Sequence, residues 1–547
     1  MKQLLLSYLF ISFGLLASAQ TAPNKYWVEF TDKNHNDYTI DKPDEFLSSK
    51  AIARRENQGI TITAQDLPVS DFYIDSLKKI GVQIHNVSKW LNAVTIGTTN
   101  PDHLTQIDAL DFVQNRQKTE RLQSKLNELN FRVAPLMSSN SYYITDADYG
   151  ESTEQLFMLN TQVLHKQGYE GQGKTIAVID AGFYKANELP VLSNLFANNQ
   201  ILGYYDFVAH DGSVFEDHDH GMKVLSIMGG YAPGDYIGAA PKANYWLLRS
   251  EDAGSEYIIE EDNWVAAAEF ADSAGADIIN TSLGYTEFDD VSQNHSYEDL
   301  DGTTTRITQA ADIASEKGML VVVSAGNSGN DEWKFISAPA DANFVISVGA
   351  VDADGYYARF SSQGPTADGR VKPNVSAMGQ GTVVQTTAGN LAPGNGTSFS
   401  APIIAGAAAC LWQYFPEKTN LEIKDLIEKS SSQYDDPDYF TGYGIPDFGV
   451  AAGLTPVDDH DQFSSLKIYP NPFTNALHIK THHFPGKDCQ LKLLDITGKT
   501  IIHRSVKEVY EGKSIEISGL SNLKNGVYIL QLFSKDFVLQ EKVIKQK

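Results

Sequence analysis

The chain has 547 residues, which is too many for one compact domain and suggests two to four. Apolar residues make up 42% of the sequence, enough to fill hydrophobic cores, so the composition excludes a disordered chain. The net charge of −26 repels phosphate groups and argues against nucleic acid as a partner.

The N-terminus has the features of a secretory signal peptide. Lys2 precedes an apolar run over residues 4–16, and Ala17-Ser18-Ala19 follows as a small-residue cleavage site. The run is shorter than a bilayer requires, and no later stretch is long and apolar enough to span one. We therefore expect cleavage after Ala19 and a soluble mature protein outside the cytoplasm. Two cysteines, Cys410 and Cys489, are too few for a disulfide framework.

The region up to residue 135 predicts a small α+β unit. Residues 26–30 alternate like a strand, residues 71–80 have apolar positions near helical spacing, and residues 90–96 indicate another strand. The polar stretch 116–130 predicts a surface helix or linker. Residues 138–150, rich in Ser, Asn, Asp and Tyr, predict an exposed loop.

The middle of the chain predicts a parallel sheet covered by helices. Residues 152–155 form a capping-box pattern that predicts a helix toward Leu164, and residues 175–179 form a continuous apolar run typical of a buried strand. Similar runs recur at 245–248, 278–283, 319–323 and 344–348, with helical stretches at 264–273 and 308–316 between them. This alternation is typical of an α/β fold.

After residue 461 the pattern is all β. Short strands are predicted at 466–469, 477–479, 491–495, 515–517, 527–532 and 538–543, with turn signals between them. Such spacing predicts a small β-sandwich.

Asp180 follows the run 175–179 and precedes Ala181-Gly182. Functional groups gather at the carboxyl ends of parallel strands, so Asp180 is a candidate catalytic residue, with a turn aspartate as the alternative.

Residues 216–220, Glu-Asp-His-Asp-His, offer two interpretations. A metal site is one, but ligands adjacent in sequence rarely converge and no second metal motif is present. A single catalytic histidine at a loop-to-helix junction fits better. We favour His220 over His218 because Gly221 beside it allows another segment to approach closely.

Ser398 lies in Gly396-Thr397-Ser398-Phe399-Ser400-Ala401-Pro402, which opens a helix of small residues. A serine there is ordinarily an N-cap. The small residues and Pro402 permit burial of this helix end, where backbone N–H groups favour a developing oxyanion, so Ser398 is a candidate nucleophile.

Two further strand ends carry candidates. Asn327, after the strand 321–323 and beside Gly326, is either a polar turn residue or an amide donor to an oxyanion. Residues 279–284 end in Gly284, where a substrate backbone could pair as an added strand.

In chain order these segments resemble the subtilisin family of serine peptidases over residues 156–454. The order Asp, His, Ser is that of subtilisin and differs from chymotrypsin and the α/β-hydrolases. The resemblance implies a subtilisin-like α/β fold with Asp180, His220 and Ser398 as the catalytic triad. It implies Asn327 as the oxyanion donor and a substrate groove lined by Ser282, Leu283, Gly284, Ala325 and Gly326. Ala181 and Met222 depart from the family, which usually has Thr or Ser at the first position and Thr at the second.

The flanking regions also resemble known modules. Residues 26–96 resemble the family's inhibitory propeptide, and residues 466–473 with 526–530 resemble the type A sorting domain of the type IX secretion system. A carbohydrate- or partner-binding sandwich is the alternative for the tail.

The resulting domain prediction has six parts. They are a signal peptide (1–19), a propeptide-like domain (20–135), a processing loop (136–150), a catalytic domain (151–456), a linker (457–465) and a sorting domain (466–547).

The resemblance implies a secreted or cell-surface serine endopeptidase that needs no cofactor for catalysis. Members of the family bind structural calcium, for which we can place no ligands here. The implied partners are protein or peptide substrates, the chain's own propeptide as inhibitor, and the secretion machinery. The cleavage preference does not follow from the sequence.

Two rival functions fit the sequence less well. An α/β-hydrolase esterase needs G-x-S-x-G, but position 400 is serine and the order of acid and base differs. An adhesin on an inactive protease scaffold would normally show a replaced triad residue, and none is replaced.

Overall fold

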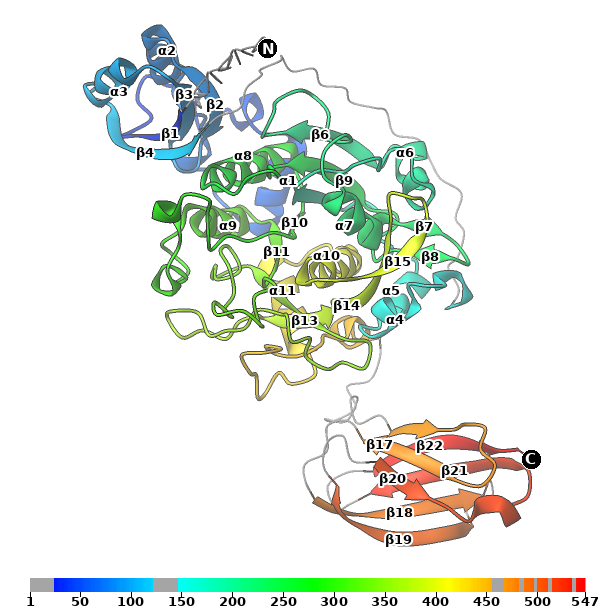
Figure 1. The fold of residues 1–547 in the computed structure, drawn as a ribbon. Helices are drawn as coiled ribbons and strands as arrows, with labels where there is room; N and C mark the ends of the chain where they lie inside the picture. Colours follow the sequence, from blue (N-terminus) through cyan, green and yellow to red (C-terminus); the bar gives the residue numbers. More distant parts are fainter. Residues whose placement is uncertain are drawn as a thin grey trace, which may run out of the picture. The chain divides into compact units, whose positions relative to one another are not determined.

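The computed structural model describes residues 24–121, 146–454, 466–481, 487–495, 499–509, 514–533 and 538–546 (Figure 1). The chain divides into two compact units, residues 1–451 and 452–547. The predicted signal peptide and residues 138–145 of the predicted loop lie outside the described residues. In the described part of the chain, no helix combines the length and apolar character needed to cross a bilayer.

The N-terminal part of the first unit is a four-stranded antiparallel sheet in the order β2-β3-β1-β4. Its strands are β1 (Asn24–Phe30), β2 (Gln83–Ser88), β3 (Ala93–Thr98) and β4 (Val113–Arg121). Its helices are α1 (Ser49–Gln58), α2 (Asp71–Ile80) and α3 (Pro101–Asp108). The predicted α+β character is confirmed, including the helix over residues 71–80.

One prediction in this region was wrong. Residues 116–121 belong to β4 and pair with β1, whereas the polar stretch had predicted a helix or linker. β4 lies at the edge of its sheet. Most of its side chains from residue 113 to 118 are solvent-accessible, so the strand carries polar residues without losing its pairing.

The rest of the first unit is built on a seven-stranded parallel sheet in the order β13-β12-β11-β10-β5-β9-β6. Its strands are β5 (Thr175–Asp180), β6 (Ile201–Asp206), β9 (Asn244–Arg249), β10 (Ile278–Thr281), β11 (Leu320–Ser324), β12 (Ile346–Val351) and β13 (Val375–Met378). Short antiparallel pairs are β7 (Tyr231–Ala232) with β8 (Tyr236–Ile237), and β14 (Gln380–Gln385) with β15 (Leu391–Asn395). The predicted α/β class and the five expected strands are confirmed, while β6 and β13 had not been predicted.

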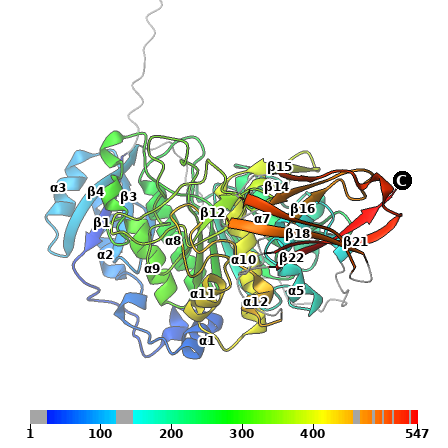
Figure 2. The same cartoon turned by 90° about the horizontal axis from the view of Figure 1, so that it is seen from below.

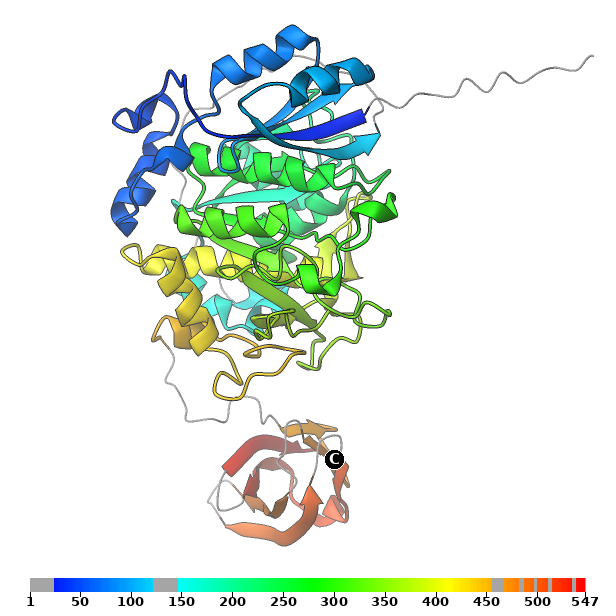
Figure 3. The same ribbon diagram turned by 90° about the vertical axis from the view of Figure 1, so that its left-hand side faces the viewer.

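Helices cover both faces of this sheet (Figure 2). They are α4 (Thr153–Phe157), α5 (Thr161–Lys166), α6 (Ser193–Ala197), α7 (His220–Gly229), α8 (Ile259–Ala274), α9 (Arg306–Glu316), α10 (Thr397–Tyr414), α11 (Asn420–Lys429) and α12 (Phe448–Ala451). Helices α8 and α9 share one buried apolar cluster with the sheet, and α7 and α10 pack on the other face. The four-stranded sheet lies beside α8, which contacts β2 (Figure 3).

The predicted capping box at Ser152 was wrong. The Ser152 hydroxyl donates to the carbonyl oxygens of Tyr149 and Ile237, at 2.8 and 2.7 Å, and accepts no bond from the helix. The expected single helix toward Leu164 is two short ones, because Asn160 adopts a left-handed conformation between them.

The second unit has two antiparallel sheets, β16-β17-β20 and β19-β18-β21-β22. Its strands are β16 (Leu466–Tyr469), β17 (Leu477–Thr481), β18 (Lys487–Asp495), β19 (Thr500–Val509), β20 (Ser514–Ile517), β21 (Gly526–Phe533) and β22 (Val538–Lys545). One apolar cluster, which includes Phe473, Leu491 and Leu530, draws on both sheets. The six predicted strands are confirmed, and β19 had not been predicted. Cys489 is buried in this cluster and Cys410 in α10, and the two do not form a disulfide in the described part of the chain.

Candidate active site

Asp180 and His220 form a buried pair at the carboxyl edge of the parallel sheet. Asp180 is the last residue of β5, and His220 is the first residue of α7. His220 Nδ1 lies 2.7 Å from Asp180 Oδ1, which also accepts the Ala181 N–H at 2.8 Å. Asp180 is 1% exposed, so its carboxylate can fix the ring of His220 in one orientation.

Two glycines allow this pair to form. A Cβ on Gly221 would lie 2.6 Å from the carbonyl oxygen of Gly182 and 2.9 Å from Asp180 Cβ. Gly182 has a φ of +142°, and a Cβ there would lie 2.7 Å from the His218 nitrogen. The β5 turn and the start of α7 therefore approach more closely than any side chain would permit.

Ser398 stands in the first turn of α10, a helix whose first 16 residues are buried. Pro402 has no N–H, so the Ser398 carbonyl one turn earlier lacks its usual helical donor. That carbonyl accepts the Ser282 hydroxyl at 3.0 Å, and Ser398 Oγ donates to the Ser282 carbonyl at 3.1 Å. Because the proline leaves this carbonyl without a helical donor, the first turn of α10 can hydrogen-bond to Ser282, which directly follows β10.

His220 and Ser398 come from facing elements but share no direct hydrogen bond among those of the described residues. The ring of Phe399, next to Ser398, stacks on His220 with centroids 6.0 Å apart. Hydrogen bonds of a catalytic pair are often long without substrate and shorten when it binds.

Asn327 follows β11 and is oriented by Thr397. Its Oδ1 accepts the Thr397 N–H at 2.8 Å and the Thr397 hydroxyl at 3.0 Å, so Nδ2 remains as the outward donor. A point at the Cβ position of Gly396 would lie 3.8 Å from Asn327 Nδ2 and 3.7 Å from the Ser398 nitrogen. The Ser398 nitrogen and the Asn327 side-chain amide therefore lie near one another at the start of α10.

The expected groove residues lie at the ends of β10 and β11. Ser282 contacts Ser398 as described, and the Leu283 carbonyl accepts the Ser324 hydroxyl at 3.4 Å. Gly326 exchanges bonds with the Thr397 hydroxyl, while a Cβ on Gly284 would lie 2.1 Å from Ser337 Oγ. Ala325 is buried, and its N–H donates to the Val348 carbonyl at 2.9 Å.

His218 is the weaker base candidate in the structure as well. Its Nδ1 accepts the His220 N–H at 3.3 Å, and its ring centroid lies 6.4 Å from that of His220. In the part of the chain that the structure describes, no carboxylate hydrogen-bonds to its ring as Asp180 does to His220. Residues 216–220 do not form a three-ligand metal cluster within the described chain.

A cavity of about 180 Å³ adjoins the pair and had not been predicted. Its wall includes Asp180, His220, Ser282 and Leu283. The opposite wall includes three glutamates, Glu251, Glu256 and Glu260, which we call the Glu cluster. The sequence held one signal for it, since no Lys or Arg occurs between Arg249 and Arg306.

Comparison with protein families agrees with the fold. The Subtilase family model matches residues 171–444, just over half of the chain. The chain belongs to the subtilase family. It is accordingly a serine-type endopeptidase. The Bacteroidota S8 propeptide domain matches residues 25–132, and the secretion system C-terminal sorting domain matches residues 467–546, which indicates secretion by the type IX route.

Individual relatives are distant. This subtilase is 27% identical to serine protease AprX of Bacillus subtilis over 379 residues, covering 61% of this chain and 82% of AprX. It is 28% identical to subtilisin E of the same species over 319 residues, covering 57% of this chain and 72% of the relative. Among solved structures, MycP1 of Mycobacterium smegmatis is 24% identical, with a TM-score of 0.43 over 62% of this chain and 92% of that one.

Structural calcium, which occurs in subtilases, does not fit the Glu cluster well. It is the one group of three metal-binding side chains in the described part of the chain, with ligand atoms within 4.8 Å of one another. Calcium takes six to eight oxygens. Glu260 already accepts the Asp252 and Tyr257 N–H groups, and Glu251 accepts the Tyr285 and Ser250 hydroxyls.

The pair predicts the acid limb of the subtilase's pH profile. Burial lowers the pKa of His220, but the charge and hydrogen bond of Asp180 outweigh burial and hold that pKa above 6.5. A general base must be neutral, so kcat/KM is expected to fall as pH drops through a pKa above 6.5. Asp180→Asn should move this limb to lower pH. A limb unchanged in Asp180→Asn would show that His220 does not control it.

Proposed function

We propose that this subtilase is exported as a precursor and hydrolyses peptide bonds through Asp180, His220 and Ser398. The observation that carries the proposal is the 2.7 Å pair of Asp180 and His220 facing Ser398 at a buried helix N-terminus. A structural turn aspartate or an N-cap serine would not need this convergence.

Each residue then has one role in the reaction. His220 takes the proton of Ser398 Oγ, which attacks the substrate carbonyl, while Asp180 stabilises the imidazolium that forms. Asn327 Nδ2 and the Ser398 N–H donate to the oxyanion. His220 returns the proton to the leaving amine, and water then releases the acyl group from Ser398.

A fluorophosphonate probe tests the proposal directly. The processed protein should form a covalent adduct at Ser398, located by mass spectrometry of its peptides. His220→Ala should abolish labelling, because the hydroxyl then lacks its base, whereas His218→Ala should retain it. Labelling of another serine, or labelling that requires His218, would contradict the assignment.

Asn327→Ala is expected to lower kcat about 10²- to 10³-fold with little change in KM. This is the scale of loss for the equivalent donor in subtilisin, a member of the family. The amide contributes only when negative charge develops on the carbonyl oxygen. Steady-state kinetics on a peptide amide measures both constants, with exposed Asn198→Ala as the control. A change confined to KM would mean that Asn327 binds the ground state.

We infer that the domain at residues 20–135 inhibits the catalytic domain, as its propeptide match suggests. The two are joined by a buried ionic cluster. The carboxylate of Asp272, on α8, contacts Arg54, Arg55 and Lys89. Asp66 contacts Arg55 and Lys317, at 2.8 and 3.1 Å. We call these residues the buried ion cluster.

A neighbouring carboxylate extends this contact. Glu269, also on α8, accepts the Ser88 hydroxyl at 2.6 Å and the Lys89 and Trp90 N–H groups at 2.6 and 3.0 Å. Charged groups that are paired across two domains favour one docking geometry.

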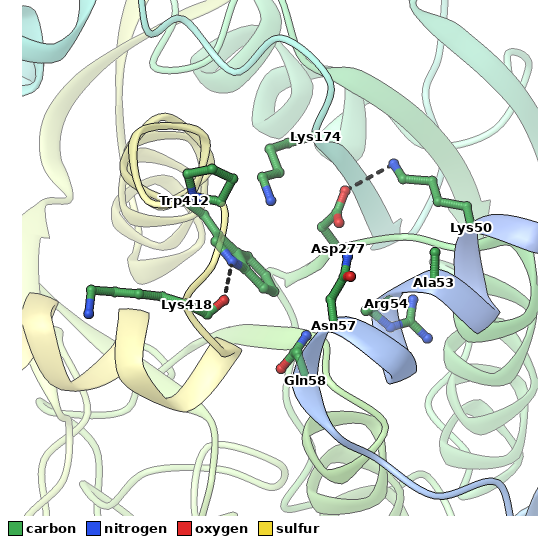
Figure 4. Close-up of a pocket in the computed structure, with 10 residues that line it drawn as sticks. Lys50, Ala53, Arg54, Asn57, Gln58, Lys174, Asp277, Trp412 and Lys418 are labelled. Carbon is green, nitrogen blue, oxygen red and sulfur yellow. Dashed lines mark hydrogen bonds and ion pairs between the residues drawn. The ribbon is translucent and has the colours of Figure 1, made fainter.

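A second contact lies beside the ion cluster, on the same helix as Arg54 and Arg55. Helix α1 packs against the amino ends of β5, β10 and β11, where Lys50 binds Asp277 at 3.0 Å and Gln58 binds the Gly318 carbonyl at 2.8 Å. Beside it is a hollow of about 120 Å³ in which Lys174 lies 4.4 Å from the Trp412 ring (Figure 4). The catalytic residues lie at the opposite, carboxyl ends of the strands.

The remaining domain boundaries and the export route are part of the proposal. We propose removal of residues 1–19 on export, self-cleavage within residues 136–150, a catalytic domain over residues 151–456, and a linker (457–465) to the sorting domain (466–547). N-terminal sequencing of the secreted protein locates the first two cuts.

A further inference from the structure

The Glu cluster is unusual in having no positive partner. Its three carboxylates bring ligand oxygens within 4.8 Å of one another. Among the described residues, no Lys, Arg or His forms an ion pair with Glu251, Glu256 or Glu260, whereas Asp180, Asp206 and Asp272 each have at least one such partner. Like charges this close repel, so the cluster is electrostatically incomplete.

A buried, unpaired oxygen faces the same cavity. Asp180 lines the cavity, is 1% exposed, and its Oδ2 has no hydrogen-bond partner among the described residues. Buried carboxylate oxygens are normally paired. Five carboxyl groups, those of Asp180, Asp252 and the Glu cluster, therefore line the cavity next to His220.

The ionisation of the cluster agrees with this geometry. Burial, followed by the charge of Asp289, raises the pKa of Glu256 to about 7. Burial likewise raises the pKa of Glu251 and of Glu260, and the neighbouring glutamates add to it. A cation that entered would displace protons from these groups and relieve their repulsion.

The position of the cavity favours a cation that belongs to the substrate. Ser282 and Leu283 line both the cavity and the proposed groove, so a chain bound there would pass its mouth. A volume of about 180 Å³ is below the roughly 300–1,000 Å³ of sites for whole small molecules, and suits one side chain. The net charge of −26 would also attract basic peptides.

We propose that the Glu cluster binds an ammonium or guanidinium group of the peptide substrate, so that this subtilase prefers basic residues near the scissile bond. The inference rests on the proposed function and adds the substrate class. Glu251 and Glu256 are half-buried and face the entering group, and buried Glu260 holds the loop 252–257 through its two backbone N–H bonds.

The test compares matched peptides. Internally quenched peptides differ only by Lys or Gln at each of four positions on either side of the scissile bond. At one position Lys should raise kcat/KM roughly 10- to 100-fold, the range expected for a charged hydrogen bond. Glu256→Gln should lower this Lys-to-Gln ratio about tenfold, and Glu251→Gln provides a second variant. Exposed Glu188→Gln, outside the cavity, should leave the ratio unchanged.

Two further measurements identify which chemical group supplies the cation. If the Lys-to-Gln ratio is near one but acetylating the peptide N-terminus lowers kcat/KM, the bound group is the terminal amine, and the preference for basic side chains is overturned. If calcium or EDTA changes the melting temperature of the wild type but not of Glu256→Gln, a metal occupies the cluster and the proposal is overturned. A ratio near one at every position also overturns it.

Fluorophosphonate labelling of the same preparations separates this inference from the proposed function. Labelling at Ser398 without a preference for basic residues would contradict only the proposed substrate class. Absence of both labelling and hydrolysis would contradict the proposed catalytic triad.

Discussion

Ser398→Ala is expected to lower kcat by up to about 10⁶-fold and to leave the protein as an unprocessed precursor. That magnitude is known for the nucleophile of subtilisin, a member of this family. His220→Ala should cost about as much, because a triad acts as a unit and either loss stops acyl transfer. Kinetics on a peptide amide and N-terminal sequencing, with wild type purified in parallel, measure both effects.

The control is His218→Ala, which should cost less than about tenfold. Among the described residues, the His218 ring makes one hydrogen bond, from the backbone N–H of His220, so its loss leaves the Asp180 hydrogen bond in place. An essential His218 with a dispensable His220 would reverse the assignment of the base. Processing of Ser398→Ala to the wild-type N-terminus, with no other protease present, would remove the case for self-cleavage.

Asp272→Asn is expected to weaken inhibition by the propeptide roughly 10²- to 10³-fold. Burial alone would raise the pKa of Asp272, but the charges of Lys89, Arg54 and Arg55 hold it below its usual value. Removing one member of a buried ionic group costs about 3–5 kcal/mol, because its partners stay buried without compensation. The inhibition constant of the fragment at residues 20–121, added to the processed enzyme, measures the loss.

Lys50→Met gives the matched control at the second contact. Lys50 is 40% exposed in its pair with Asp277, and exposed pairs contribute at most about 1 kcal/mol. Its loss should change the inhibition constant less than about fivefold. Equal effects of Asp272→Asn and Lys50→Met would show that burial of the ion cluster does not dominate affinity.

The strands that could be predicted from the sequence are those with continuous apolar runs. Residues 175–179 and 320–324 lie inside the parallel sheet and are buried on both faces. Their continuous apolar composition therefore predicts them as strands. Strands β4, β6 and β19 lie at sheet edges, where one face can carry polar residues, and their patterns resemble loops. The predicted capping box at Ser152 was wrong because the Ser152 hydroxyl bonds to the carbonyl oxygens of Tyr149 and Ile237 and not to the helix.

The residues of the candidate site also divide into those that a local motif predicts and those that only the folded chain brings together. Asp180, His220 and Ser398 could be singled out because each lies in a recognisable local motif. The contact through which Thr397 orients Asn327 joins residues 70 positions apart, so no local sequence pattern predicts it. The Glu cluster depends on the cavity wall, which joins β5, β10 and the segment after β9 only in the folded chain.

The N-terminal domain holds the catalytic domain through two segments, and this bears on how long inhibition lasts after the chain is cut. Helix α1 supplies Arg54 and Arg55 to Asp272, and the end of β2 with the turn after it supplies Lys89 to the same carboxylate and the Ser88 hydroxyl to Glu269. When one segment lifts off, the other keeps its partner at a high effective concentration, so the first tends to close again. Dissociation then requires both segments to leave at once, which lengthens residence beyond what either would give alone. A second cut between α1 and β2 would remove this coupling, and proteolysis of the excised fragment would then act as the timer of activation.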